Sequence, residues 1–124
     1  MIRLTLLLLV LHSPFFGALA ATSPTLDCFQ KAYSKYGLDL NQEDAAFLCS
    51  GAISSMPVEC FRSTYPVAGI RLDRKLALIL CQGARSLEPI NCYKSTFPPS
   101  SGLRIEDRNA VILCRGAAGN DGAD

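Results

Sequence analysis

The chain has 124 residues, of which 49% are apolar and 19% charged, with six cysteines, one histidine and a formal net charge of +1. The near-neutral charge excludes a strongly basic nucleic-acid-binding protein, and the apolar content is too high for a disordered chain. The sequence therefore predicts one small folded domain with no nucleic-acid partner.

Residues 1–20 have the pattern of an export signal. Arg3 precedes a leucine-rich run, Ser13-Pro14 interrupts it, and small residues close it at Ala18-Leu19-Ala20. The alternative is a membrane anchor, but a spanning helix needs about 20 continuous apolar residues, and the proline breaks this run. We expect cleavage after Ala20 or Ala21, no membrane span afterwards, and a secreted or periplasmic protein.

The exported part of the chain has a composition that limits its chemistry. It holds 11 basic and 11 acidic side chains, and it loses the only histidine, His12. A Ser-His-Asp or Cys-His catalytic site needs a histidine. The acidic pairs Glu43-Asp44 and Glu106-Asp107 fall in the first turns of predicted helices, where the helix dipole accounts for them. We expect no enzyme activity and no cofactor.

Three copies of one sequence unit follow the signal, and the cysteines mark them. The first cysteine recurs after 32 and 32 residues, the second after 32 and 33, and each copy ends in Leu-Cys-x-Gly-Ala. Residues 24–55, 56–87 and 88–119 are named units 1, 2 and 3. They form one predicted domain over residues 21–117, with a flexible tail at 118–124.

Each unit is predicted to fold as a hairpin of two short helices, the first of which begins at a serine cap followed by proline. In unit 1 this start is Ser23-Pro24, and Pro57 and Pro89 mark it in units 2 and 3. The helix is expected to bury an apolar stripe along one side. In unit 1 the stripe consists of Leu26, Phe29, Tyr33, Cys28 and Ala32.

A glycine and a second helix are expected after the first helix of each unit. The glycine is expected to supply a left-handed turn, at Gly37, Gly69 and Gly102. The second helix is expected to start near a polar cap, at Asn41, Asp73 or Glu106, and to stop at Gly51, Gly83 or Gly116. In unit 1 its buried face would hold Ala45, Leu48, Cys49 and Ala52. The predicted fold is all-α, with three disulfide-stapled hairpins stacked into a small solenoid-like domain.

An even number of cysteines in an exported chain predicts disulfides, and six cysteines allow 15 connectivities. An antiparallel hairpin would bring together the two cysteines of each unit. This pairing joins Cys28 to Cys49, Cys60 to Cys81 and Cys92 to Cys114. The alternative joins neighbouring units through Cys49 to Cys60 and Cys81 to Cys92. No close C-x-x-C pair is present, which argues against a metal site or a redox centre.

Surface binding is the function that remains. Equivalent positions of stacked units form columns, and basic residues gather in the columns of units 2 and 3. They predict a patch for an anionic ligand, made of Arg62, Arg71, Arg74, Lys75, Lys94 and Arg104. The alternative is an ordinary surface of mixed charge.

The sequence therefore favours a non-catalytic binding module that acts outside the cytoplasm, with a protein or an anionic surface as its partner. A secreted effector, such as an inhibitor, toxin or antimicrobial protein, is one alternative. The exported part has no net charge, which counts against an effector that acts on membranes. A structural component of the cell envelope is the other alternative.

Overall fold

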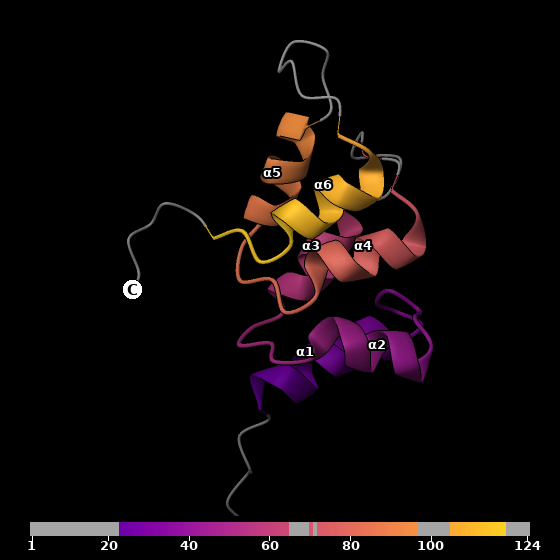
Figure 1. Cartoon of the computed structure of the whole chain (residues 1–124). Coiled ribbons are helices and arrows are strands. Elements are labelled where there is room, and N and C mark those ends of the chain that lie inside the picture. Colours follow the sequence, from indigo (N-terminus) through magenta and orange to yellow (C-terminus); the bar gives the residue numbers. More distant parts are fainter. Residues whose placement is uncertain (1–22, 65–69, 71, 97–104, 119–124) are drawn as a thin grey trace, which may run out of the picture.

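The computed structural model describes residues 23–64, 70, 72–96 and 105–118, and within them all regular structure is helical (Figure 1). The predicted signal at 1–20 and all but the first residue of the predicted tail lie outside this part. Six helices are present in it, and the all-α prediction is confirmed. They are α1 (Pro24–Tyr33), α2 (Gln42–Cys49), α3 (Met56–Arg62), α4 (Arg74–Cys81), α5 (Glu88–Thr96) and α6 (Asp107–Cys114).

Helices α1, α2 and α4 begin at the polar caps that the sequence predicts. Before α3 and α5, the Ser54 and Ser86 hydroxyls each accept a hydrogen bond from the amide two residues on, at 3.2 Å, and Ser55 makes no cap bond. The Ser23 hydroxyl accepts a hydrogen bond from the Leu26 amide at 3.2 Å at the start of α1. Side-chain oxygens of Asn41 and Asp73 do the same for α2 and α4, each at about 2.7 to 2.8 Å. Glu106 makes no such bond before α6. These caps satisfy amides that a helix start leaves without a partner, and each contributes about 1 kcal/mol.

The second helix of each unit ends before a glycine in the left-handed conformation. Gly37, which follows the first helix of unit 1, does not have this conformation. Gly51, Gly83 and Gly116 have φ of 70°, 61° and 73°. The prediction of a left-handed Gly37 is wrong, because Asp39 takes that conformation with φ 52°. A Cβ at Gly37 would overlap the Lys31 carbonyl, so this glycine permits a close backbone approach. Gly69 and Gly102 lie outside the described residues.

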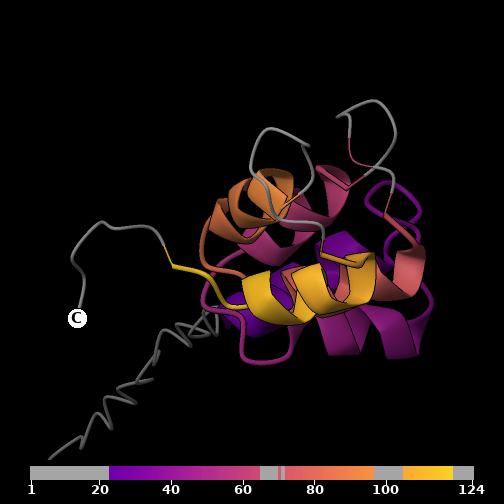
Figure 2. The same cartoon turned by 45° about the horizontal axis from the view of Figure 1, so that its top comes forward.

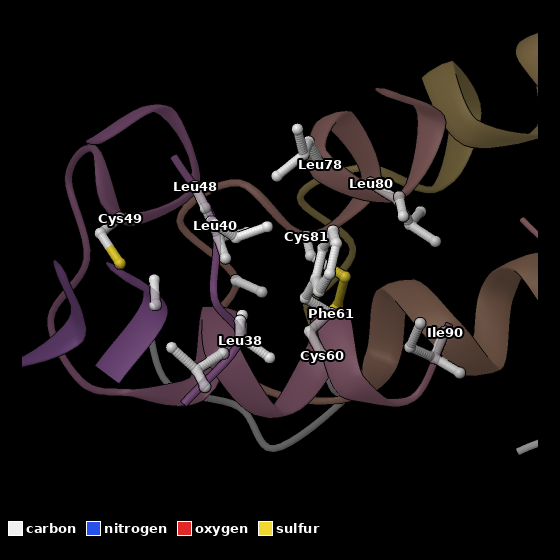
Figure 3. Packing of buried hydrophobic residues seen from close by; sticks show 14 of the residues in the cluster. Leu38, Leu40, Leu48, Cys49, Cys60, Phe61, Leu78, Leu80, Cys81 and Ile90 are labelled. Atoms are coloured by element: carbon white, nitrogen blue, oxygen red, sulfur yellow. A yellow bond between two sulfur atoms is a disulfide. The ribbon is translucent and has the colours of Figure 1, made fainter. Parts of the chain in front are cut away.

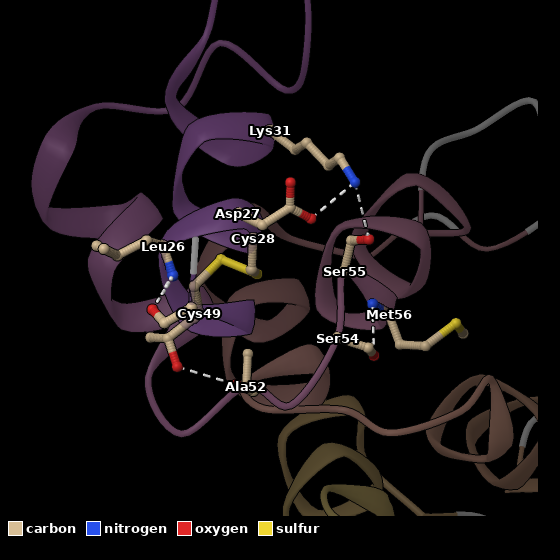
Figure 4. Close-up of a disulfide and its surroundings, with 11 residues drawn as sticks. Leu26, Asp27, Cys28, Lys31, Cys49, Ala52, Ser54, Ser55 and Met56 are labelled. Atoms are coloured by element: carbon tan, nitrogen blue, oxygen red, sulfur yellow. Dashed lines mark hydrogen bonds and ion pairs between the residues drawn. A yellow bond between two sulfur atoms is a disulfide. The ribbon is translucent and has the colours of Figure 1, made fainter. Parts of the chain in front are cut away.

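The pairing of cysteines within each unit is confirmed. Three disulfides join Cys28 to Cys49, Cys60 to Cys81 and Cys92 to Cys114, with Cα atoms 5.5 to 5.6 Å apart. Each links the middle of one helix to the end of the next, as Figure 4 shows for α1 and α2. The alternative pairing between units is therefore wrong. Three intramolecular disulfides indicate an oxidising environment outside the cytoplasm.

The helices of each unit contact one another, and the second helices lie side by side. Helix α4 contacts both α2 and α6 (Figures 1 and 2). Units 1 and 2 also meet through α3, which contacts α1 and α2, whereas unit 3 contacts unit 2 through α4. The regular solenoid expected from the sequence stays a prediction.

One apolar cluster runs through all three units, between the helices (Figure 3). The predicted buried face of α2 is confirmed, since Ala45, Leu48 and Cys49 are buried together with Ala52. The largest fully buried side chains of the apolar cluster are Phe61 in unit 2 and Tyr93 in unit 3.

The predicted buried stripe of α1 is wrong in part. Cys28 and Ala32 are buried, but Leu26 and Tyr33 are more than half exposed, and Phe29 is only partly buried. At 100° per residue, Leu26 lies about 160° around the helix from Cys28, so burial of one side chain leaves the other free. Residues at the matching positions of unit 2, Val58 and Phe61, are buried.

Candidate functional site

The structure describes four of the six predicted anion-binding residues, which belong to α3, α4 and α5. Arg62 pairs with Glu59 on α3 at 3.0 Å, and Arg74 pairs with Asp44 across α4 and α2 at 2.7 Å. Lys75 follows Arg74 in the first turn of α4, and Lys94 is exposed near the end of α5. The other two residues, Arg71 and Arg104, lie outside the described residues. The anion patch stays a prediction.

One depression, of about 360 Å³, lies between α1, α3 and the segment after α1. Most of its lining residues are of polar type, and they include side chains of both charges. The lining residues are Asp27, Gln30, Lys31, Ser34, Tyr36, Gly37 and Arg62. Lys31 donates to Asp27 at 2.8 Å and to the Ser55 hydroxyl at 3.1 Å (Figure 4). The Lys31 ammonium is therefore already bound by neighbouring groups.

A second depression, of about 260 Å³, lies between α2 and α4 and has an apolar floor. Phe47, Leu78 and Ile79 supply the apolar surface, and Glu43, Asp44 and Lys75 surround it. Phe47 is 40% exposed. An apolar floor with a few charged groups around it is typical of a surface that binds an apolar side chain of a protein.

The floor belongs to a stripe that crosses all three second helices. Phe47, Ile79 and Ile112 each precede the Leu-Cys pair of their unit, so they occupy equivalent positions of α2, α4 and α6. We call these three residues the outer stripe. Phe47 and Ile112 are exposed, and Ile79 is partly buried. Phe47 and Ile79 line the same depression, and α4, which carries Ile79, contacts both α2 and α6.

Sequence reasoning missed the outer stripe. An apolar residue at this position of a helix is indistinguishable by type from a core residue. The helical period could have indicated it. Phe47 immediately precedes Leu48, which is buried, and successive residues of a helix point about 100° apart.

The most perturbed titratable group in the described chain is Tyr93 on α5. Its side chain is buried, and its hydroxyl donates to Asp107 Oδ1 at 3.1 Å. Burial raises the pKa of Tyr93 well above its usual range, and the hydrogen bond and negative charge of Asp107 raise the pKa further. The Tyr93–Asp107 hydrogen bond links α5 to α6 within unit 3.

We expect the stability of the protein to fall more steeply above pH 10 than that of a Tyr93→Phe variant. In the unfolded chain the phenol titrates near pH 10, and in the folded chain its pKa is higher. The contribution of Tyr93 to the free energy of unfolding is therefore complete below about pH 10. It falls as the pH rises, by about 1.4 kcal/mol per pH unit for one proton. Urea unfolding of both proteins at about pH 9 and about pH 11 measures the difference. Equal losses would contradict the assignment.

No family model, curated protein or solved structure matches the chain. Within the described residues, none of the helices combines the length and apolar character that crossing a membrane requires. The same residues contain no group of three or more His, Cys, Asp or Glu side chains placed to hold a metal ion. The depression between α2 and α4, together with the outer stripe, is the candidate functional site because it combines exposed apolar surface with charged side chains at its edge.

Proposed function

We propose that the protein is a non-catalytic binding module that acts outside the cytoplasm, in the periplasm or after secretion, and that binds a protein partner on the outer stripe. The observation that carries the proposal is the exposure of Phe47 and Ile112, with the partly buried Ile79 at the equivalent position of the helix between them. A helix that only supports the fold needs no such residues on its outer surface. The signal pattern at 1–20 and the three disulfides support the location.

The partner is expected to insert an apolar side chain between Phe47 and Ile79, which both line the depression. Aromatic residues are common anchors of protein interfaces, and Phe47 is the only aromatic group among the described residues that line this depression. Glu43 and Lys75 stand at its edge with opposite charges, which would orient the partner more than they would strengthen binding.

The experiment places a photoreactive phenylalanine analogue at position 47 of the exported protein and irradiates it in the native extracytoplasmic fraction. A matched probe at Tyr36, which is 87% exposed and lies outside the outer stripe, serves as the control. We expect position 47 to yield a cross-linked protein that position 36 does not yield. Capture of that protein should fall about tenfold or more on Phe47→Ala. Identical products from both positions, or none from position 47, would contradict the proposal.

A further inference from the structure

Equivalent residues of the three units differ in burial according to the place of the unit in the chain. The residue two before the first cysteine is 57% exposed as Leu26 in unit 1, but only 1% and 2% exposed as Val58 and Ile90 in units 2 and 3. The residue after that cysteine follows the same order. It is partly buried as Phe29, and buried as Phe61 and Tyr93.

The second helix repeats this order at one position. Ala46 of unit 1 is exposed, whereas Leu78 and Val111 at the equivalent positions are buried. We call the surface formed by Leu26, Phe29 and Ala46 the leading face of unit 1. Tyr33 extends it, because its ring stacks on that of Phe29 with centroids 5.4 Å apart and its side chain is half exposed.

The opposite order holds for the leucine that precedes the second cysteine. Leu48 of unit 1 and Leu80 of unit 2 are completely buried, but Leu113 of unit 3 is 64% exposed. We call the surface around Leu113 the trailing face. The chain thus ends its helical array with an open apolar surface on each of its two terminal units.

The two faces are the two sides of a junction that already exists inside the chain. In Figure 3, Leu40 and Leu48 of unit 1 lie on the side of Phe61 that faces unit 1, and Leu80 lies toward Ile90 of unit 3. Helix α2 contacts both α3 and α4, and the Gly83 amide donates to the Leu48 carbonyl at 3.0 Å. A trailing leucine of one unit is therefore covered by the leading residues of the next.

From this we infer that the protein associates head to tail with a second copy of itself, so that the trailing face of one copy packs on the leading face of another. Repeat proteins that stay monomeric usually end in units with polar outer surfaces, whereas the described residues of units 1 and 3 expose Leu26 and Leu113. Within the chain, residues equivalent to the leading face are covered by the preceding unit, and residues equivalent to the trailing face by the following unit. The trailing face of a second copy therefore matches the leading face best. Such a heterologous contact leaves one face free on each end of the dimer, so it extends to chains or closes into rings.

The contact is expected to be weak and nearly independent of salt. Its centre consists of Leu113 against Leu26 and Phe29, without an ion pair, so the driving force is the removal of apolar surface from water. Charge repulsion does not oppose it, because the exported part has no net charge.

The test is sedimentation velocity of the exported protein over a wide concentration range, for the parent and for Leu26→Glu and Leu113→Glu. Both side chains are exposed, so the variants are expected to fold, and circular dichroism of each verifies this. The parent should form dimers and longer species as the concentration rises, and either variant should weaken association about tenfold or more. Ile53→Glu is the matched control, since Ile53 is 57% exposed and its equivalents Arg85 and Ala118 are exposed too.

A mixture of the two variants separates head-to-tail contact from other arrangements. Leu26→Glu retains an intact trailing face and Leu113→Glu an intact leading face, so together they should form a dimer that does not extend. A parent that stays monomeric at all concentrations, an equal effect of Ile53→Glu, or no dimer in the mixture would overturn the inference. Sedimentation of the purified protein needs no partner protein, whereas cross-linking at position 47 needs one, so failure of self-association and failure of the proposed function give different results.

Discussion

Removal of the central disulfide by the double substitution Cys60→Ala and Cys81→Ala is expected to lower the free energy of unfolding by about 3 to 5 kcal/mol. The bridge closes a loop with a sequence separation of 21, for which loss of chain entropy alone predicts roughly 3 kcal/mol. Both cysteines are fully buried, and α4 contacts helices of all three units. A domain of this size has about 5 to 15 kcal/mol of stability in total, so the loss brings it close to unfolding.

The matched control removes the third bridge by Cys92→Ala and Cys114→Ala. Its loop is almost the same, with a separation of 22, but Cys92 is only partly buried and unit 3 has one neighbour. The two bridges therefore contribute nearly the same chain entropy. We expect a smaller loss of unfolding free energy for this variant, and the difference between the two variants measures the contribution of packing. Denaturant unfolding followed by circular dichroism measures both. A loss below about 1 kcal/mol for the central pair would mean that the helices do not depend on the bridge.

The local structure could be predicted from the sequence because it depends on neighbours along the chain. A serine or asparagine side chain can cap a helix start by accepting from the amide three residues on, as at Ser23 and Asn41, although Ser55 does not do so. The disulfide pairing followed from the same logic, since each hairpin brings its own two cysteines together whatever the other units do. The left-handed residue after α1 was misplaced, because the polar Asp39 also tolerates that conformation.

Exposure could not be predicted, because it depends on which unit lies next in space. Leu26 and Val58 are both apolar and hold the same place in their units, yet only Val58 has a preceding unit beside it. The candidate site was missed for a related reason. Phe47 and Leu48 are adjacent apolar residues of one helix, and only the packing of α2 against its neighbours decides which of them faces water.

The largest effect of one substitution is expected for Phe61→Ala, with a loss of about 3 to 5 kcal/mol. Phe61 is 2% exposed and lies where unit 2 meets Leu40 and Leu48 of unit 1 (Figure 3). Truncation removes the ring from this junction and leaves a cavity that three disulfide-linked hairpins have little freedom to close. Urea unfolding gives the loss directly.

Phe29→Ala is the matched control, because the same residue type stands at the same place in unit 1 but lacks a unit to cover it. At low protein concentration we expect it to cost about 1 kcal/mol, mainly through the lost contact with Tyr33. If the leading face packs on a second copy, this cost grows with concentration, whereas that of Phe61→Ala stays constant. Unfolding of both variants at two concentrations therefore measures how much a neighbouring unit adds to the free energy of unfolding at this position. Phe61→Ala reports a neighbour within the chain, and Phe29→Ala reports a neighbour in a second copy. Equal costs for the two variants at low concentration would mean that coverage by unit 1 adds nothing to the burial of Phe61.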